Sequence, residues 1–362
     1  MKLLRKIHLY LGLILGMAFM LTAISGTILV YRPEIISLSL DAKTPDYKKI
    51  GEEDAVKAIT ELTGPDINFI DFPMKDAPWY RVWTWNGTIS YYDPTTLKKM
   101  PVKYHMTEIM IFLSDLHIHF LGGHLGEQIL GYTGIILIFM IMSGIWIWWP
   151  FRRGFTFKEM IPFNFKRKTS LKSHRSFGII NALVMFIVTL TGVALVFYAP
   201  SQKIVSTFLG EKVSQEDLDL RYKKAIKTLP TSVKIANLED FTRYYFKNIP
   251  EGDLARFYMP KPETPTIARI RFRYPESMSP FGASFLFADL EKQKIVRFED
   301  YRHAPEYYHV SRTYYALHSG KTGGIIYKFL VALSGFALAL LCITGFNAWY
   351  KTGKRKNKNF YS

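Results

Sequence analysis

The sequence predicts an α-helical membrane protein: a four-span bundle produced by an internal duplication, with two α+β domains outside the membrane. Three observations predict this fold: four long apolar runs, basic clusters beside them, and a repeated pattern of His, Gly and Ser or Thr. The runs contain no Asp, Glu, Lys or Arg and cover residues 7–31, 128–149, 177–198 and 329–350. Each run is long enough to cross a bilayer core of about 30 Å as a helix.

The net charge of +17 is concentrated beside these runs. Basic residues precede the first run, fill the link between the second and third, and follow the fourth: Lys2, Arg5, Lys6, Arg152, Arg153, Lys158, Lys166, Arg167, Lys168, Lys172, Arg175, Lys351, Lys354, Arg355, Lys356 and Lys358. Lys and Arg next to spans are typical of cytoplasmic segments. Both termini and the central link are therefore expected in the cytoplasm, and the charge does not indicate nucleic-acid binding.

This alternation divides the chain into eight segments. Spans are expected at 1–31, 116–150, 174–199 and 314–350, outward domains at 32–115 and 200–313, a basic link at 151–173 and a basic tail at 351–362. The first run also has the basic start of a signal peptide, but it continues into LVYRPE without a small-residue cleavage site. The only cysteine, Cys342, excludes a disulfide within one chain and any site built from several cysteines.

The two halves of the chain repeat one another at constant spacing. His8, Gly12 and Ser25-Gly26 return as His174, Gly178 and Thr191-Gly192; His117, Thr133-Gly134 and Ser143-Gly144 return as His318, Ser334-Gly335 and Thr344-Gly345. Small residues let membrane helices approach closely, so the Ser/Thr–Gly pairs are expected at helix–helix contacts.

The outward segments each contain helical and strand patterns. GEEDAVKAITELTG and LEDFTRYYFKNI have helical spacing, WYRVWTWNGTISYYD predicts a hairpin at Asn86-Gly87, and ASFLFADLEKQKIVRF predicts another. TIARIRFRY alternates as a strand with Arg269, Arg271 and Arg273 on one face. That face is either an ordinary solvated surface or a stripe that attracts anions.

Four histidines occupy repeated positions at the ends of spans. His8 and His174 are expected near the cytoplasmic face, and His117 and His318 near the outer face. Neutral imidazoles from facing helices are good axial ligands for haem iron. They could instead bond lipid headgroups or loop carbonyls, and zinc or copper would require three or four ligands close together.

The outer ligand has more than one candidate. His124 lies seven residues after His117 and would share its helix face unless Gly122-Gly123 interrupt the helix. His124 is therefore an alternative outer ligand, and His119 is a further neighbour without a counterpart in the repeat.

The motifs RKIHLYLGLILG, KSHRSFGIINALV, LHIHFLGGHLG and ALHSGKTGG resemble those of PepSY-associated transmembrane proteins, often called iron-regulated membrane proteins. YYDPTTLKKM and PFGASFLFADLEKQKIVRF resemble the closing hairpins of PepSY domains, so the resemblance covers nearly the whole chain. Two departures are Leu9 after His8, where the family often has Arg, and LHIH in place of the commoner LHR.

The resemblance implies periplasmic PepSY-like domains in a bacterial inner-membrane protein. In the siderophore-reductase members, span histidines hold b-type haems that pass electrons to ferric siderophores. Carried over by motif, His8, His174, His117 and His318 become ligands of two haems. No nucleotide-binding fingerprint is present, so a quinol or a cytoplasmic reductase must supply electrons.

Two further classes of function stay open. A non-catalytic membrane protein would use its PepSY-like domains to bind a peptide, a peptidase or an uptake partner. A transporter is disfavoured because four spans are few and none carries an acidic residue. Membrane lipid is an expected partner in every case, and nucleic acid is not.

Overall fold

The computed structural model describes residues 1–154, 164–211, 234–261 and 263–358, so parts of the predicted basic link and tail lie outside the described residues. The chain divides into two compact units. The helical unit comprises Met1–Tyr31, Ile109–Tyr198 and Tyr314–Ser362, and the sheet unit comprises Arg32–Glu108 and Ala199–Thr313.

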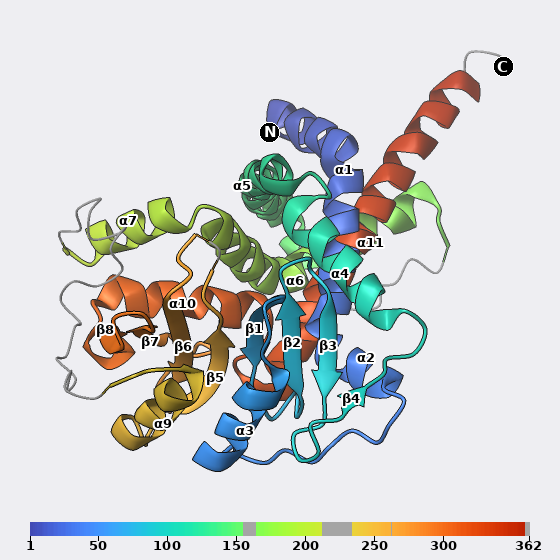
Figure 1. Cartoon of the computed structure of the whole chain (residues 1–362). Coiled ribbons are helices and arrows are strands. Elements are labelled where there is room, and N and C mark those ends of the chain that lie inside the picture. Colours follow the sequence, from blue (N-terminus) through green and yellow to red (C-terminus); the bar gives the residue numbers. More distant parts are fainter. Residues whose placement is uncertain (155–163, 212–233, 262, 359–362) are drawn as a thin grey trace. The chain divides into compact units, whose positions relative to one another are not determined.

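Four helices of the helical unit are long and apolar enough to cross a membrane, and they cover the four predicted runs to within two residues at the ends. They are α1 (Lys2–Val30), α5 (Gly123–Trp148), α6 (Arg167–Val196) and α11 (Gly324–Lys358) (Figure 1). In the bundle, α1 packs against α5 and α11, and α6 packs against the same two helices. Helices α1 and α6 therefore lie diagonally across the bundle from each other, as do α5 and α11.

Two glycines allow close packing of neighbouring helices. A Cβ atom at Gly335 on α11 would lie 2.3 Å from Oγ1 of Thr27 on α1, and one at Gly134 on α5 would lie 2.6 Å from Cγ2 of Val193 on α6. At these two positions the predicted helix–helix contact is found.

Shorter helices precede two of the spans. α4 (Met106–His119) ends four residues before α5 begins, and α10 (Glu306–His318) ends before α11. A short 3-10 helix, η1 (Trp149–Gly154), follows α5. The break after α4 includes Phe120 and Leu121 in left-handed backbone conformations, so residues 117 and 124 do not share one continuous helix.

The sheet unit contains one antiparallel sheet with the strand order β4-β3-β2-β1-β5-β6-β7-β8. Its strands are β1 (Ile67–Asp71), β2 (Tyr80–Thr84), β3 (Ile89–Tyr92), β4 (Lys99–Met100), β5 (Asp253–Tyr258), β6 (Ile267–Arg273), β7 (Ser284–Asp289) and β8 (Lys294–Glu299). Its helices are α2 (Arg32–Ser39), α3 (Glu52–Leu62), α7 (Tyr198–Phe208), α9 (Leu238–Asn248) and η3 (Tyr301–His303).

The two outward segments meet in one continuous sheet. Strand β1 of the first segment pairs with β5 of the second, with Ile70 opposite Phe257 and Asp71 opposite Arg256. Each segment alone supplies half a sheet with an unpaired central edge, and the pairing of those edges hydrogen-bonds both. The two predicted α+β segments therefore share one sheet, a pairing that the sequence did not predict.

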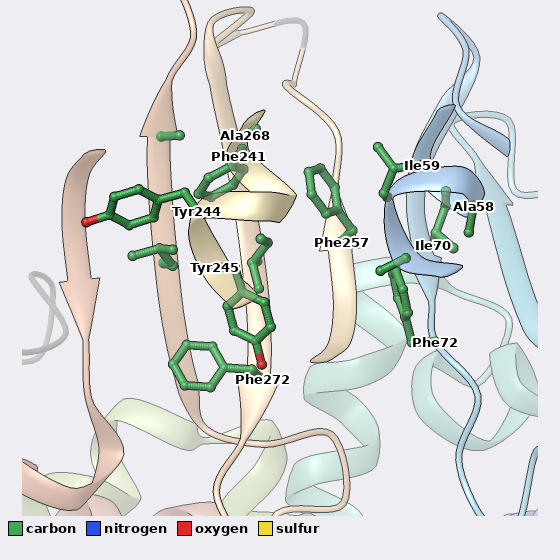
Figure 2. Close-up of a cluster of buried hydrophobic side chains, with 14 of the residues drawn as sticks. Ala58, Ile59, Ile70, Phe72, Phe241, Tyr244, Tyr245, Phe257, Ala268 and Phe272 are labelled. Carbon is green, nitrogen blue, oxygen red and sulfur yellow. The ribbon is translucent and has the colours of Figure 1, made fainter. Parts of the chain in front are cut away.

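One hydrophobic core lies between this sheet and helices α3 and α9. Figure 2 shows Ile59 of α3 beside Ile70 and Phe72, and Phe241 of α9 close to Phe257. On β6 the residues between the arginines face this core, since Ala268, Ile270 and Phe272 are fully buried. The predicted alternation of TIARIRFRY is confirmed.

The predicted hairpins are also present. β2 and β3 are joined at Asn86-Gly87, where Gly87 has φ +85°, a backbone conformation that glycine adopts without strain. The second hairpin joins β7 and β8. The two predicted helices of the outward segments are α3 and α9.

Candidate functional site

The four repeat-matched histidines meet as two pairs inside the helical unit. His8 of α1 lies opposite His174 of α6, with 6.3 Å between their ring centroids. His117 of α4 lies opposite His318 of α10, with 5.9 Å between centroids. Each pair joins the two halves of the chain, and His8 and His174 come from helices that lie diagonally across the bundle.

In every one of these imidazoles, Nδ1 is bonded to a neighbouring helix. Nδ1 of His117 lies 2.9 Å from the Thr22 carbonyl oxygen, that of His318 lies 2.8 Å from the Val188 carbonyl oxygen, and that of His174 lies 3.0 Å from the Leu341 carbonyl oxygen. His8 differs, because its Nδ1 lies 2.9 Å from the hydroxyl of Ser143. A carbonyl can only accept, so Nδ1 carries the proton in the first three, which leaves Nε2 as a lone-pair nitrogen.

The Ser/Thr–Gly pairs that end each span form the surfaces on which these imidazoles rest. A Cβ atom added at Gly26 or Gly192 would lie 2.6 or 2.8 Å from Cε1 of His117 or His318. At Gly144 and Gly345 the corresponding distances to His8 and His174 are 3.4 and 3.3 Å. These four glycines therefore accommodate imidazoles, whereas the sequence predicted only close packing of helices.

The neighbouring hydroxyl groups bond to the helix turn beneath the imidazoles. Ser25 donates to the Thr22 carbonyl at 3.0 Å, and Thr191 donates to the Val188 carbonyl at 3.0 Å. These are the carbonyls that receive His117 and His318. In the sequence, these residues were marked by the identical spacing of His and Ser/Thr–Gly in the two halves. That spacing did not predict which helices contact each other.

A cavity of about 530 Å³ adjoins the His8–His174 pair. Its lining is mostly apolar and includes Cys342, and its polar residues are the two histidines, Thr352 and three arginines, Arg5, Arg167 and Arg175. This volume lies within the range of roughly 300–1,000 Å³ that is usual for small-molecule and cofactor sites. An apolar cavity with cationic groups suits a flat apolar molecule that carries carboxylates.

The paired imidazoles fit a metal held by two protein ligands. Two imidazoles that bind one metal from opposite sides, with each nitrogen about 2 Å from it, place their ring centroids about 6 Å apart. Within the described residues, no group of three or more His, Cys, Asp or Glu could hold a metal ion. A haem needs only two axial ligands from the protein, and it combines an apolar macrocycle with two carboxylates. The residues therefore fit haem at the His8–His174 pair, and the ligand geometry repeats at His117–His318.

The other histidines of this region are turned away from the pairs. The side chain of His124 is 84% exposed, with its Nδ1 lying 3.3 Å from Glu127. His119 pairs with Asp115 one helical turn earlier, at 2.8 Å. Of the three histidines considered for the outer position, His117 is the one that faces His318.

The three arginines of β6 are engaged within the sheet unit. Arg271 donates from Nε and from a terminal nitrogen to the carbonyl oxygen of Gly282, at 3.0 and 2.8 Å. Arg273 bonds to Asp253 at 3.3 Å. The guanidinium of Arg269 lies 3.7 Å from the ring centroid of Tyr258. They share one face, as predicted, but two of the three brace neighbouring strands and loops.

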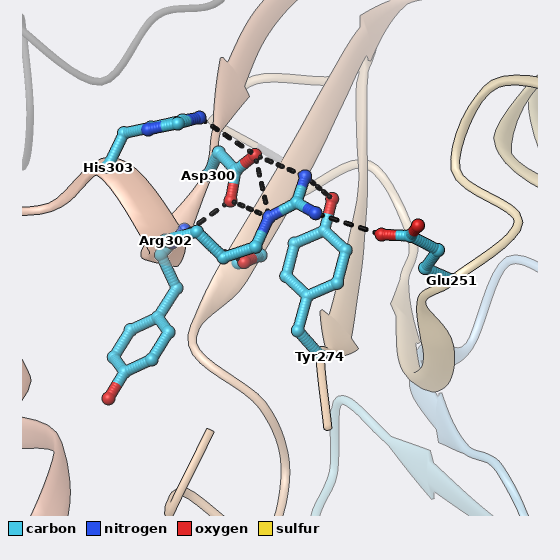
Figure 3. Close-up of polar contacts among 7 residues, drawn as sticks. Glu251, Tyr274, Asp300, Arg302 and His303 are labelled. Carbon is cyan, nitrogen blue, oxygen red and sulfur yellow. Dashed lines mark hydrogen bonds and ion pairs between the residues drawn. The ribbon is translucent and has the colours of Figure 1, made fainter. Parts of the chain in front are cut away.

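A cluster of polar side chains surrounds Asp300 in the sheet unit (Figure 3). Arg302 bonds to both oxygens of the fully buried Asp300 carboxylate, at 3.1 and 2.8 Å, and also contacts Tyr274 and Glu251. Burial, followed by the charge of Asp300, raises the pKa of Tyr274 to about 12. Both carboxylate oxygens are occupied, so this cluster stabilises the fold and offers no open ligand position.

Comparison with known proteins supports the predicted family. A family model described as PepSY-associated TM region matches residues 5–352. No curated protein matches the chain. The family match covers the four spans and both parts of the sheet unit together. The chain therefore belongs to the family of proteins with a PepSY-associated TM region.

Proposed function

We propose that this protein is a haem-containing reductase that passes electrons across a bacterial inner membrane to ferric siderophores. The observation that supports it best is the pairing of four imidazoles, each with Nδ1 bonded and Nε2 left for a metal. His8 with His174 would hold one haem b, and His117 with His318 a second. A half-buried imidazole at membrane depth is costly to place there, which favours a function over a purely structural role.

Bound haem supplies reversible one-electron chemistry at its iron. The protein's residues keep the imidazoles neutral, fix their orientation through Nδ1, and surround them with apolar helices that exclude water. Oxidation of one quinol to quinone releases two electrons and two protons, and two ferric chelates each accept one electron. Siderophore oxygens are hard ligands suited to ferric iron, so reduction weakens the chelate and frees the metal.

The charge of the chain supports one orientation in the membrane. Basic residues beside the spans favour an orientation with both termini and the central link in the cytoplasm and the sheet unit in the periplasm. The matching contacts of His117 with Gly26 and of His318 with Gly192 support an origin by internal duplication. A reporter fused after Ser362 is expected to be active only in the cytoplasm, and activity in the periplasm would reverse this topology.

On the substrate side, the face of β6 with Arg269, Arg271 and Arg273 is the candidate surface for attracting an anionic ferric chelate. Arg269 stacks on Tyr258, Arg271 bonds to Gly282 and Arg273 bonds to Asp253. Burial would raise the pKa of Tyr258, but the charges of the three nearby arginines Arg256, Arg271 and Arg269 lower it below its ordinary value. The direction of this shift supports a positive potential on this face.

The decisive experiment is a visible spectrum of the purified full-length protein in detergent. The proposal predicts a Soret band, sharp α-bands on reduction, and two haem equivalents in a pyridine hemochrome assay. Reduced protein should be reoxidised by a ferric siderophore. A colourless preparation would instead support the non-catalytic alternative, in which the PepSY-like sheet binds a peptide, a peptidase or an uptake partner.

Labelling of Cys342 provides an independent test of whether haem occupies the cavity beside His8 and His174. It is the only cysteine and lines the cavity beside His8 and His174. A thiol reagent should therefore label it faster after the haem has been extracted than before. Equal labelling rates in both states would place the chromophore somewhere other than this cavity.

A further inference from the structure

Four glycines of the helical unit lie against the paired imidazoles, but not equally closely. The distance from an added Cβ to Cε1 is 2.6 Å at Gly26 and 2.8 Å at Gly192, against 3.4 Å at Gly144 and 3.3 Å at Gly345. Ordinary contacts of a Cβ begin at 3.4 Å. A methyl group therefore does not fit against either imidazole of the His117–His318 pair. Against the imidazoles of the His8–His174 pair, a methyl group would lie at or just inside an ordinary contact distance.

The reason lies in what a helical side chain covers. In an α-helix a side chain lies over the turn that precedes it, and it shields the carbonyl four residues earlier. The carbonyls of Thr22 and Val188, which receive Nδ1 of His117 and His318, stand four residues before Gly26 and Gly192. Only glycine leaves these carbonyls open to a second donor from another helix.

From this geometry we infer that Gly26 and Gly192 are positioning residues for the His117–His318 pair. An alanine at Gly26 would push the imidazole of His117 back by about 0.8 Å to restore an ordinary contact. A retreat of this size away from α1 stretches the 2.9 Å bond to Thr22 beyond hydrogen-bond range. Nδ1 then loses its acceptor, and with it the orientation and tautomer that present Nε2 to a metal.

The inference extends the proposed function, on which it rests, because it ranks the two sites by their tolerance of a methyl group. Alanine at Gly144 requires almost no movement of His8, whose Nδ1 is held by a hydroxyl that can rotate with it. The His8–His174 site should therefore accept alanine at Gly144, whereas the His117–His318 site should accept it at neither Gly26 nor Gly192.

The test compares Gly26→Ala and Gly192→Ala with Gly144→Ala in full-length protein. Gly16→Ala is the matched control, since Gly16 is buried in the same helix α1 and an added Cβ meets nothing within 4 Å. We expect Gly26→Ala and Gly192→Ala to lose one of two haem equivalents, or to change the electron paramagnetic resonance signal of one haem only. Gly16→Ala and Gly144→Ala should match the parent.

A second measurement does not depend on haem. In protein labelled with nitrogen-15 histidine and stripped of haem, the Nδ1–H signal that His117→Ala abolishes should shift in Gly26→Ala and not in Gly16→Ala. An unshifted signal, or a parent-like haem signal in Gly26→Ala, would overturn the positioning role. A parent without haem would refute the proposed function, while the nitrogen-15 comparison would still decide the role of Gly26.

Discussion

In the helical unit the paired half-buried side chains are imidazoles, whereas in the sheet unit the buried polar groups include carboxylates that pair with guanidiniums. Each imidazole uses Nδ1 for one bond and retains Nε2. Asp71 and Asp300 use both carboxylate oxygens, Asp71 for Arg81 and Arg256 and Asp300 for Arg302.

This difference distinguishes side chains that can still bind a ligand from side chains whose bonding groups are fully used within the fold. A neutral imidazole that keeps a lone pair can still bind a ligand, and it costs less to hold in an apolar medium than an ion does. A buried carboxylate between two arginines has no capacity left and becomes destabilising if one partner is removed. The two units should therefore respond differently when their buried polar groups are substituted.

The largest effect is expected in the helical unit. Ala at His117 or at His174 should each remove one of two haem equivalents and leave the other, because the two pairs do not share a ligand. His124→Ala is the control, since the side chain of His124 is exposed and lies beside Glu127. Haem content is measured by a pyridine hemochrome assay. Full content in all four single variants of the paired histidines would refute the ligand assignment.

In the sheet unit, Asp71→Asn should destabilise the fold without changing haem content. Asp71 bonds to Arg81 on β2 and to Arg256 on β5, so its loss leaves two buried guanidiniums poorly paired where the segments meet. Breaking a buried ion pair typically costs about 3–5 kcal/mol. Hydrogen exchange of peptides covering β1 and β5 should be faster than in the control Asp66→Asn, whose side chain is exposed. Unchanged protection would mean that Asp71 contributes little.

The pH dependence of this contribution has a definite sign. Burial would raise the pKa of the Asp71 carboxyl, but the charges and hydrogen bonds of Arg81 and Arg256 outweigh burial, so the pKa lies below its ordinary value of 3.8. A lowered folded pKa means that the stability is fully present above about pH 3.8 and is lost as pH falls through the folded pKa. The difference in unfolding free energy between parent and Asp71→Asn should therefore shrink below pH 3.8. A difference that stays constant with pH would contradict the pairing.

The smallest effect concerns the arginines of β6. Neutral substitution of Arg269, Arg271 and Arg273 together should slow reduction of an anionic ferric chelate several-fold at low ionic strength, because steering by surface charge is screened by salt. Arg271→Gln alone should also loosen the loop at Gly282, because Arg271 donates to the Gly282 carbonyl oxygen. A neutral chelate serves as the control. Equal rates for both chelates, in variants and parent, would leave these side chains with a structural role only.

The sequence alone determined the local elements of this protein. Apolar runs predicted the four spans, Asn86-Gly87 predicted a hairpin, and strict alternation in TIARIRFRY assigned its two faces. These features depend on hydrophobicity and backbone preference over a few neighbouring residues, which is information that a short stretch of sequence contains. The constant spacing of His and Ser/Thr–Gly also identified the residues of the candidate site.

Only the tertiary structure decided which of these elements meet. Local patterns did not show that β1 pairs with β5, or that His117 rests on Gly26 and His318 on Gly192. They also did not show that Arg271 and Arg273 are already engaged. Each such contact joins residues that only folding brings together, and it depends on the shape and unsatisfied hydrogen-bonding groups of both partners. Gly26 looks the same in the sequence whether its missing side chain admits a helix or an imidazole, because the group that fills the space belongs to another helix.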